Sequence, residues 1–383
     1  MKKIKVMSVF GTRPEATKMI PIIKELDKFP ELVENIVCVT AQHREMLDQI
    51  IDPLNIKADY DLNIMKKGQT LTDITTSVLE GLNKVIDEVK PDLVLVHGDT
   101  STSFAGALAC FYNKISIGHV EAGLRTYEMY EPFPEEMNRV LTGHMATLHF
   151  SPTRQSKENL LKENISKNIF ITGNTSLDFL KETIKDNYVF SVDTLNHLDY
   201  KNHKVIVMTA HRRENLGEPL ENICKAMLRV VEENPDTILI YAVHLNPLVQ
   251  ETAKKFLGNH SRIYLVDPLD VFDMHNLMNK AYIMATDSGG LQEEVTGVNI
   301  PALVLRNVTE RPEGVEAGRL KLVGSDVEKI VSSMNELLQN KSSYQAMLKG
   351  KSPFGDGNAS ERIVNVILYN YGLTTEKPVD YFI

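Results

Sequence analysis

Residues 92–103 read DLVLVHGDTSTS, an unbroken apolar run followed at once by a polar turn. Runs that are apolar throughout are typical of strands buried on both faces of a parallel sheet. The same rhythm continues along the whole chain. Further apolar runs lie at 4–10, 36–40, 115–120, 169–172, 205–209, 238–243, 263–266, 282–285 and 302–305. Segments of helical period separate them, for example 16–29, 71–89, 220–233 and 327–338. This alternation predicts an α/β fold.

The apolar runs form two series of about five strands each, which predicts two Rossmann-like domains. The polar stretch around 173–203 interrupts the pattern, so we expect an N-terminal domain over 1–173 and a C-terminal domain over 174–357. The last helical segment, near 358–371, is amphipathic. We expect it, with the rest of 358–383, to join the first domain.

The composition excludes several classes of partner. A formal net charge of −9 argues against a nucleic-acid or anionic-membrane partner.

The three cysteines, Cys38, Cys110 and Cys224, have no paired spacing and indicate buried thiols in a reducing compartment, not a disulfide framework or a metal site. The first apolar run stops at Gly11, too early for a signal peptide, and no stretch reaches membrane-spanning length. We therefore expect a soluble, cytoplasmic protein.

Three acidic clusters lie at strand ends or helix starts. Asp99 is in HGDTSTS, Glu121 in VEAGLRT and Glu135 in PEEMNR. Because the carboxyl ends of parallel strands open on the same side of a sheet, we expect these carboxylates to converge on one cleft, with Arg125 and Arg139 beside them. Several carboxylates around one cleft are what a two-sided proton transfer needs.

The turn after the first strand reads GTRPEATK at 11–18, and it lacks the dinucleotide fingerprint GxGxxG. A single glycine followed by Arg13 and Lys18 suits an anionic group at the start of a helix. The alternative is a loop arginine and a solvated helix lysine. Arg13 lies at a strand end, and this position favours the anion-binding interpretation.

The segment DSGGLQEE at 287–294 is the strongest signal in the second half. Ser288 can cap the next helix, and Gly289 and Gly290 let a phosphate approach the backbone N–H groups at the positive helix end. Glu294 lies about one turn later, where its oxygens can accept from both ribose hydroxyls. The alternative is an ordinary capped helix with acidic residues in its first turn.

The segment TAHRREN at 209–215 ends the first strand of the second domain with His211 and two arginines. A histidine there can stay cationic beside a diphosphate and stabilise a departing anion; the alternative is a structural imidazole. A second cluster, His97, Asp99, His119 and Glu121, could ligate a metal on paper. It matches no metal-binding motif, so we expect no metal.

Nine blocks carry a family resemblance: FGTRPEATKM, AQHREM, HGDTSTS, VEAGLRT, PFPEEMNR, TAHRREN, DSGGLQEE, TERPEG and GDGNASERI, in this order. Over essentially its whole length the chain resembles the non-hydrolysing UDP-N-acetylglucosamine 2-epimerases of bacteria and archaea. The resemblance implies a glycosyltransferase-B-like pair of Rossmann domains with a cleft between them, a homodimer, and interconversion of UDP-GlcNAc with UDP-ManNAc without a cofactor.

The resemblance also assigns roles to residues of this chain. The family's basic pair falls on Arg13 and Lys18, and its essential carboxylates fall on Asp99, Glu121 and Glu135, with Arg139 alongside. The positions that hold UDP match His211, Ser288, Gly289, Gly290 and Glu294.

The implied reaction begins with loss of UDP, because the C2 proton of the sugar has no adjacent carbonyl to acidify it. Loss of that proton then gives 2-acetamidoglucal, and reprotonation from the other face inverts C2. Two other functions fit part of the sequence. A retaining glycosyltransferase would use the same UDP site, and a non-catalytic UDP-sugar sensor would need the nucleotide residues without three acidic clusters.

Some family members bind a second UDP-GlcNAc as a regulator. The matching residues here are Gln42, His43, Met46, Arg212 and His244. This chain departs from the strictly regulated pattern, with Glu45 where a glutamine is expected and Gly68 where an arginine is expected. Because these changes remove a positive charge and add a negative one near an anionic ligand, we expect only modest activation.

Overall fold

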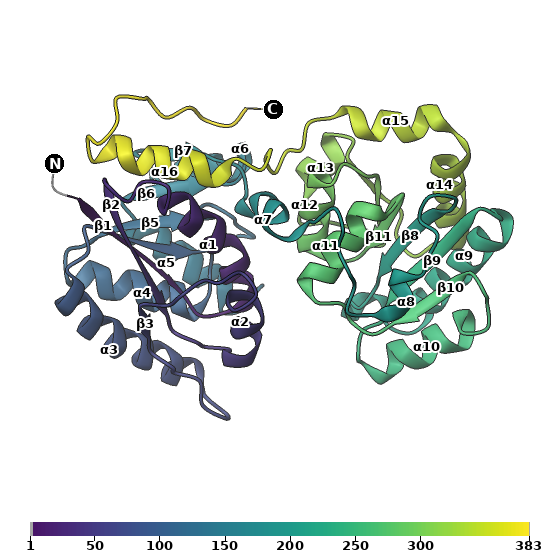
Figure 1. Ribbon diagram of the computed structural model, residues 1–383, viewed down its shortest axis with the longest axis horizontal. Coiled ribbons are helices and arrows are strands. Elements are labelled where there is room, and N and C mark those ends of the chain that lie inside the picture. Colours follow the sequence, from purple (N-terminus) through teal and green to yellow (C-terminus); the bar gives the residue numbers. More distant parts are fainter. Residues whose placement is uncertain (1–2, 383) are drawn as a thin grey trace. The chain divides into compact units, whose positions relative to one another are not determined.

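Two parallel sheets organise residues 3–382, the part of the chain that the computed structural model describes (Figure 1). Each sheet belongs to its own compact unit. Unit 1 combines the chain up to Glu182 with Gly355–Phe382, and unit 2 is Thr183–Phe354. In both units helices pack on the two faces of the sheet (Figure 1). The predicted fold class, α/β with two Rossmann-like domains, is confirmed.

The sheet of unit 1 has seven strands. They are β1 (Ile4–Phe10), β2 (Val33–Val39), β3 (Tyr60–Asp61), β4 (Leu93–His97), β5 (Ser116–Val120), β6 (Leu148–Ser151) and β7 (Ile169–Ile171). The helices are α1 (Arg13–Leu26), α2 (Arg44–Ile51), α3 (Leu71–Val89), α4 (Ser101–Tyr112), α5 (Glu135–Met145), α6 (Arg154–Lys162), α7 (Thr175–Thr183, at the boundary of the units) and α16 (Ala359–Asn370).

The sheet of unit 2 has six strands. They are β8 (Lys204–Thr209), β9 (Thr237–Ala242), β10 (Ile263–Val266), β11 (Ile283–Thr286), β12 (Ala302–Val304) and β13 (Leu320–Leu322). The helices are α8 (Asp193–Asn196), the 3-10 turn η1 (Arg213–Asn215), α9 (Glu218–Glu233), α10 (Pro247–Leu257), α11 (Val271–Lys280), α12 (Gly289–Gly297), α13 (Pro312–Glu316), α14 (Val327–Gln339) and α15 (Lys341–Lys349).

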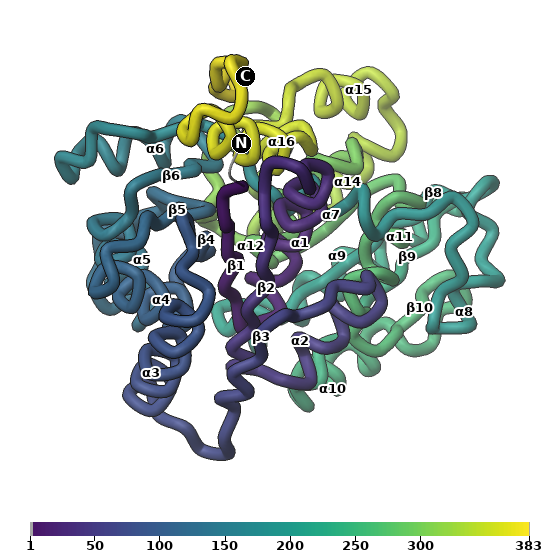
Figure 2. The backbone as a smooth tube through the Cα atoms, turned by 60° about the vertical axis from the view of Figure 1, so that its left-hand side comes forward, coloured from purple at the N-terminus to yellow at the C-terminus, as the bar shows by residue number. Residues whose placement is uncertain are grey.

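Both sheets reverse their strand order beside their first strand. Unit 1 has the order β3-β2-β1-β4-β5-β6-β7, and unit 2 has the order β10-β9-β8-β11-β12-β13. Figure 2 shows β1 between β2 and β4. In sheets of this kind ligands bind outside the carboxyl ends of the strands at the reversal, the topological switch point. The switch points here lie between β1 and β4 and between β8 and β11. We therefore expect the ligand-binding residues in the loops that follow these four strands.

Strands β3, β6 and β13 are absent from the sequence-based prediction. They have two, four and three residues, and β6 carries two polar side chains, His149 and Ser151. Runs this short do not stand out from their surroundings. They form strands because each pairs in parallel with a neighbour that is already part of the sheet.

Helix α7 belongs to unit 1, so the two units divide a little later than the expected boundary at residue 173. The buried Asp178 of α7 accepts hydrogen bonds from the backbone N–H groups of Ala359 (3.1 Å) and Ser360 (2.7 Å). These are the first residues of α16, which packs against α1. The Asp178 carboxylate therefore holds the start of α16 against α7.

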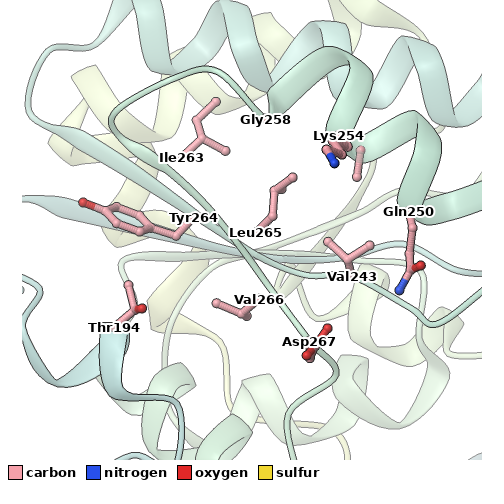
Figure 3. A pocket seen from close by; sticks show the side chains of 11 residues that line it. Thr194, Val243, Gln250, Lys254, Gly258, Ile263, Tyr264, Leu265, Val266 and Asp267 are labelled. Atoms are coloured by element: carbon pink, nitrogen blue, oxygen red, sulfur yellow. The ribbon is translucent and has the colours of Figure 1, made fainter.

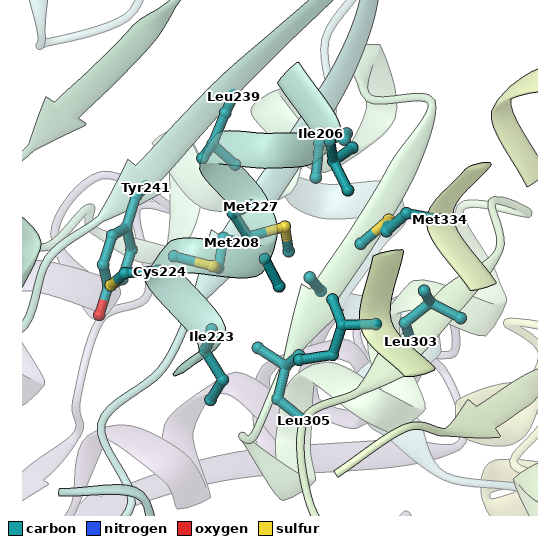
Figure 4. Packing of buried hydrophobic residues seen from close by; sticks show 14 of the residues in the cluster. Ile206, Met208, Ile223, Cys224, Met227, Leu239, Tyr241, Leu303, Leu305 and Met334 are labelled. Atoms are coloured by element: carbon teal, nitrogen blue, oxygen red, sulfur yellow. The ribbon is translucent and has the colours of Figure 1, made fainter. Parts of the chain in front are cut away.

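The core of unit 2 is closely filled on the face that packs against α9 and α14 (Figure 4). Tyr241 lies in it with its side chain fully buried, and its hydroxyl donates to the carbonyl oxygen of Ala210 at 2.9 Å. This bond supports the chain just before His211. Cys224 also lies in this core, and all three cysteines are buried and unbridged, as the sequence predicts.

No helix between residues 3 and 382 combines the length and the apolar character needed to cross a lipid bilayer.

Candidate active site

The switch point of unit 1 is crowded, mainly by threonine side chains. A Cβ atom on Gly11, directly after β1, would lie 1.9 Å from the Thr40 hydroxyl oxygen, so only glycine fits there. Gly98, directly after β4, has φ +62°, which also favours glycine. These two turns bring the start of α1 and the loop that carries Asp99 to the same edge of the sheet.

Glu121 follows β5 and has φ +63°, an uncommon backbone conformation for a residue other than glycine. Its Oε2 accepts from Lys18 Nζ at 2.5 Å and from Asn174 Nδ2 at 2.8 Å. Its Oε1 lies 3.7 Å from His97 Nε2. The structure thus brings Lys18 and Glu121 together. Asn174 is a further contact of this carboxylate that sequence reasoning missed, because an uncharged amide outside the nine motifs gives no signal of such a role.

Asp99 forms an ion pair with Arg139, whose Nη2 donates to Asp99 Oδ2. The neighbouring Asn138 donates its Nδ2 to the backbone oxygen of Asp99 at 2.9 Å. Burial raises the pKa of Asp99, Arg139 opposes that shift, and the nearby charge of Glu121 reinforces it. A carboxyl group that holds its proton more firmly is suited to act as a proton donor.

Glu135 and Glu136 begin α5 but have different environments. Glu136 is 2% exposed and accepts from the backbone N–H groups of Thr126 (3.1 Å) and Tyr127 (3.0 Å), which holds the preceding loop. Glu135 has one buried oxygen, Oε2, with no hydrogen-bond partner among residues 3–382. An unsatisfied buried carboxylate oxygen is available to a ligand or a proton.

Arg125 does not join the carboxylates as we expected. Its side chain is fully buried and forms a two-pronged ion pair with Glu163 of α6, at 2.6 and 2.7 Å. The motif VEAGLRT gives no indication of that partner. Arg13, in contrast, is the first residue of α1 and lies half-buried at the switch point.

Two histidines of the predicted acidic cluster, His97 and His119, are buried. Burial lowers the pKa of His97 to about 4 and that of His119 to about 3. His119 Nε2 lies 2.7 Å from the carbonyl oxygen of Gly98, which fixes the ring within the sheet edge. Across residues 3–382 no group of three or more possible metal ligands occurs.

Asp287 organises the switch point of unit 2. It follows β11, its side chain is fully buried, and its Oδ2 accepts from three donors. They are the backbone N–H groups of His211 (2.7 Å) and Arg212 (2.8 Å) and Asn215 Nδ2 (2.9 Å). Its Oδ1 lies 3.3 Å from His211 Nδ1. The sequence placed Asp287 at the head of DSGGLQEE but did not predict this role.

The His211 ring stacks on His244, with centroids 5.5 Å apart and planes inclined by 11°. Burial lowers the pKa of His211, and Asp287 acts in the opposite direction. The cationic imidazole that we expected is therefore disfavoured in the protein alone. The charge of a bound anion would raise the pKa of the ring.

The start of α12 leaves its backbone donors open. Ser288 occupies the N-cap position, but its side chain makes no capping hydrogen bond, contrary to our expectation. A Cβ atom on Gly290 would meet nothing within 4 Å, so packing does not explain the glycine there. Gly289 is also uncrowded by backbone, because a Cβ atom there would approach the side chains of Glu310 and Arg212, at 3.5 and 3.7 Å. An exposed helix start without a side-chain cap suits an anion.

Two adjacent glutamates in α12, Glu293 and Glu294, also have different partners in the structure. Glu294 lies 3.3 Å from His275 Nε2 of α11. Glu293 is buried and forms an ion pair with Arg311. Glu293 therefore anchors the loop before α13, and the ribose-binding role of Glu294 stays a prediction.

The residues expected to bind a regulator fall in both units. Gln42, His43 and Met46 belong to unit 1, and Arg212 and His244 belong to unit 2. Gln42 Oε1 accepts from the Thr102 hydroxyl at 2.9 Å, which gives it a structural role in the loop after β2. Met46 is 43% exposed.

A cavity of about 600 Å³ lies along β10, the edge strand of unit 2 (Figure 3). Apolar side chains such as Val243, Ile263 and Leu265 line it, with Lys254 and Asp267 at its polar parts. None of the residues predicted to bind UDP lines it. The nucleotide site therefore has to be sought at the switch point, not at this edge.

The family model described as UDP-N-acetylglucosamine 2-epimerase matches residues 24–368. The chain belongs to this family. The resemblance found in the sequence is thus confirmed. A curated UDP-N-acetylglucosamine 2-epimerase of Bacillus subtilis is 54% identical over 380 residues, which make up 99% of this chain and 98% of that protein.

Solved structures of the same family match nearly the whole of this chain. A crystal structure of a UDP-N-acetylglucosamine 2-epimerase matches with a TM-score of 0.93 and 51% identity, covering 100% of both chains. The UDP-GlcNAc 2-epimerase of Neisseria meningitidis, solved with UDP-GlcNAc bound, matches with a TM-score of 0.82 and 46% identity, covering 96% of this chain and 100% of that one.

Proposed function

We propose that the protein interconverts UDP-N-acetylglucosamine and UDP-N-acetylmannosamine. Membership of the epimerase family supports this proposal. The observation that carries it is the grouping of separate carboxylates at the switch point of unit 1, where Glu121 is held by Lys18 and Asp99 by Arg139. A sensor protein would not need this arrangement. The homodimer implied by the resemblance stays a prediction.

We propose that unit 2 supplies the groups that hold UDP. The donors at Ser288, Gly289 and Gly290 would bind the diphosphate, and Glu294 would accept from the ribose. His211, supported by Asp287, would become cationic beside the diphosphate and stabilise the charge of the departing UDP. We propose that Arg13 and Lys18 of unit 1 bind anionic groups of the same substrate.

The proposed reaction is an elimination followed by readdition. Cleavage of the C1–O bond releases UDP and leaves an oxocarbenium-like centre that acidifies C2. A carboxylate then removes the C2 proton to give 2-acetamidoglucal. Protonation of C2 from the opposite face and return of UDP to C1 complete the inversion. The reaction needs no oxidant or reductant. Each proton transfer by a side chain increases the rate by roughly 10²–10⁴-fold.

Proton NMR in D₂O tests this function directly. We expect UDP-GlcNAc to yield UDP-ManNAc that carries deuterium at C2, because the proton removed from one face exchanges with solvent before another is added. UDP and 2-acetamidoglucal should leak slowly. A glycosyltransferase would introduce no label at C2, and free ManNAc as the main product would indicate a hydrolysing enzyme. Epimerised product without deuterium would contradict the mechanism.

Regulation by a second UDP-GlcNAc should be modest. Glu45 lies in the first turn of α2, three residues after Gln42, and would repel an anionic regulator. Gly68 offers no cation to attract one. We expect UDP-ManNAc alone to be converted at a measurable rate, with only a few-fold increase when UDP-GlcNAc is added. Complete failure to convert UDP-ManNAc without added UDP-GlcNAc would show that the regulator is required.

A further inference from the structure

Glu15 is a buried carboxyl group that the proposed mechanism does not use. It is 1% exposed and lies in the first turn of α1, one turn before Lys18. Its Oε2 accepts from the backbone N–H groups of Gly11 (3.0 Å) and Thr12 (2.9 Å) and from the Thr12 hydroxyl (2.8 Å). These local contacts complete a capping box in which Thr12 is the N-cap.

The other oxygen of Glu15 leaves the local turn. Oε1 accepts from the hydroxyl of Thr100 at 2.7 Å and lies 3.0 Å from that of Ser103. Thr100 is the N-cap of α4 and directly follows Asp99. The Ser103 hydroxyl also contacts the carbonyl oxygen of His97, the last residue of β4. A single carboxyl group therefore joins the two loops that flank the switch point of unit 1.

The capping box of α3 shows that helix capping alone does not need this arrangement. There Asp73 accepts from the backbone N–H of Thr70 at 2.8 Å and from its hydroxyl at 2.7 Å, and both residues are exposed. Glu15 makes the same local contacts but is buried, with no cationic partner within ion-pair distance among residues 3–382. Because burial without a counter-ion disfavours the charged form, it raises the pKa of Glu15. The buried contacts to α4 need an explanation other than capping.

We infer that Glu15 is a positioning residue that holds the start of α1, with Arg13 and Lys18, against the start of α4, with Asp99. This inference rests on the proposed function, because the groups that Glu15 positions belong to the proposed site. Lys18 is in turn ion-paired with Glu121, so a shift of α1 would also move the partner of the second carboxylate. A displacement of about 1 Å in such a site costs on the order of 10²-fold in rate.

The substitution Glu15→Asp separates the two roles. An aspartate at this helix position makes both capping contacts with a threonine, as Asp73 does, but it is one methylene too short to reach Thr100 and Ser103 as well. We expect kcat to fall about 10²-fold. We also expect more UDP and 2-acetamidoglucal to be released per molecule of epimer, because misplaced groups give the intermediate more time to escape. A merely structural defect would reduce the number of folded molecules and leave this ratio unchanged.

Two further variants complete the test. Asp73→Ala removes an exposed capping carboxylate and should lower the thermal stability without changing kcat or the ratio of leaked UDP to epimer. Ser103→Ala removes the contact from the side of α4 and should raise the ratio, and combining it with Glu15→Asp should add little because both act through one contact. The inference is overturned if Glu15→Asp and Ser103→Ala leave the ratio at the wild-type value. Failure of the wild-type protein itself to epimerise would instead overturn the proposed function and, with it, the inference.

Discussion

Replacing Asp99, Glu121 or Glu135 singly by its amide should reduce kcat by roughly 10²–10⁴-fold while UDP still binds. An amide keeps the shape of the side chain but neither donates nor accepts a proton at the pH of the reaction. The groups that we propose hold UDP belong to unit 2, whereas all three carboxylates belong to unit 1. Calorimetry with UDP and the D₂O assay measure the two properties separately.

The three variants should differ in stability. Glu135→Gln is the cleanest, because Glu135 Oε2 has no hydrogen-bond partner among residues 3–382 that could be lost. Glu121→Gln weakens the ion pair with Lys18, and Asp99→Asn weakens the one with Arg139, so we expect a lower melting temperature for both. Glu158→Gln, at an exposed position of α6, is the control and should leave both rate and stability unchanged. Near-normal rates in all three carboxylate variants would disprove the assignment.

The substitution Asp287→Asn should preserve the fold and reduce kcat by roughly 10²-fold or more. The amide oxygen can keep the three donors now bound to Oδ2, while its NH₂ group would face His211 Nδ1, which lies 3.3 Å from Oδ1. Since Nδ1 would then have to accept a hydrogen bond, the proton would be confined to Nε2. The doubly protonated ring that stabilises departing UDP would become unfavourable.

The substitution Asp287→Asn should also shift the pH profile of kcat in a defined direction. Asp287 raises the pKa of His211, so removing its charge lowers that pKa and the imidazolium is lost at a lower pH. The alkaline limb of the kcat profile should therefore move to lower pH in Asp287→Asn. A profile and rate equal to those of the wild-type protein would show that His211 does not act as a cation.

Asp287→Ala provides the contrast. It leaves the backbone N–H groups of His211 and Arg212 and the amide of Asn215 without their buried acceptor, which costs about 1–3 kcal/mol for each unsatisfied group. We expect a large loss of unfolding free energy as well as of UDP affinity. The control Asp326→Ala removes the exposed cap of α14 and should cost only about 1 kcal/mol, with no change in kcat.

The sequence by itself determined the alternation of strands and helices, the two Rossmann-like domains and the family. Unbroken apolar runs and helical periods reflect contacts within a few residues, so they can be recognised without the fold. The same local rule placed Asp99, Glu121 and His211 at strand ends, because a strand ends where its apolar run meets a polar turn. The order of nine motifs then identified the family, which the comparisons confirm.

Only the tertiary structure decided the partners of these residues. Lys18 meets Glu121 across 103 residues of sequence, and Glu15 meets Ser103 across 88. The same level of structure separated Glu136, which holds a loop, from Glu135, which has an unsatisfied oxygen. The physical reason is that side-chain partners depend on which strands lie side by side. That order is set by packing of the whole sheet, and it brings together loops that no local pattern connects.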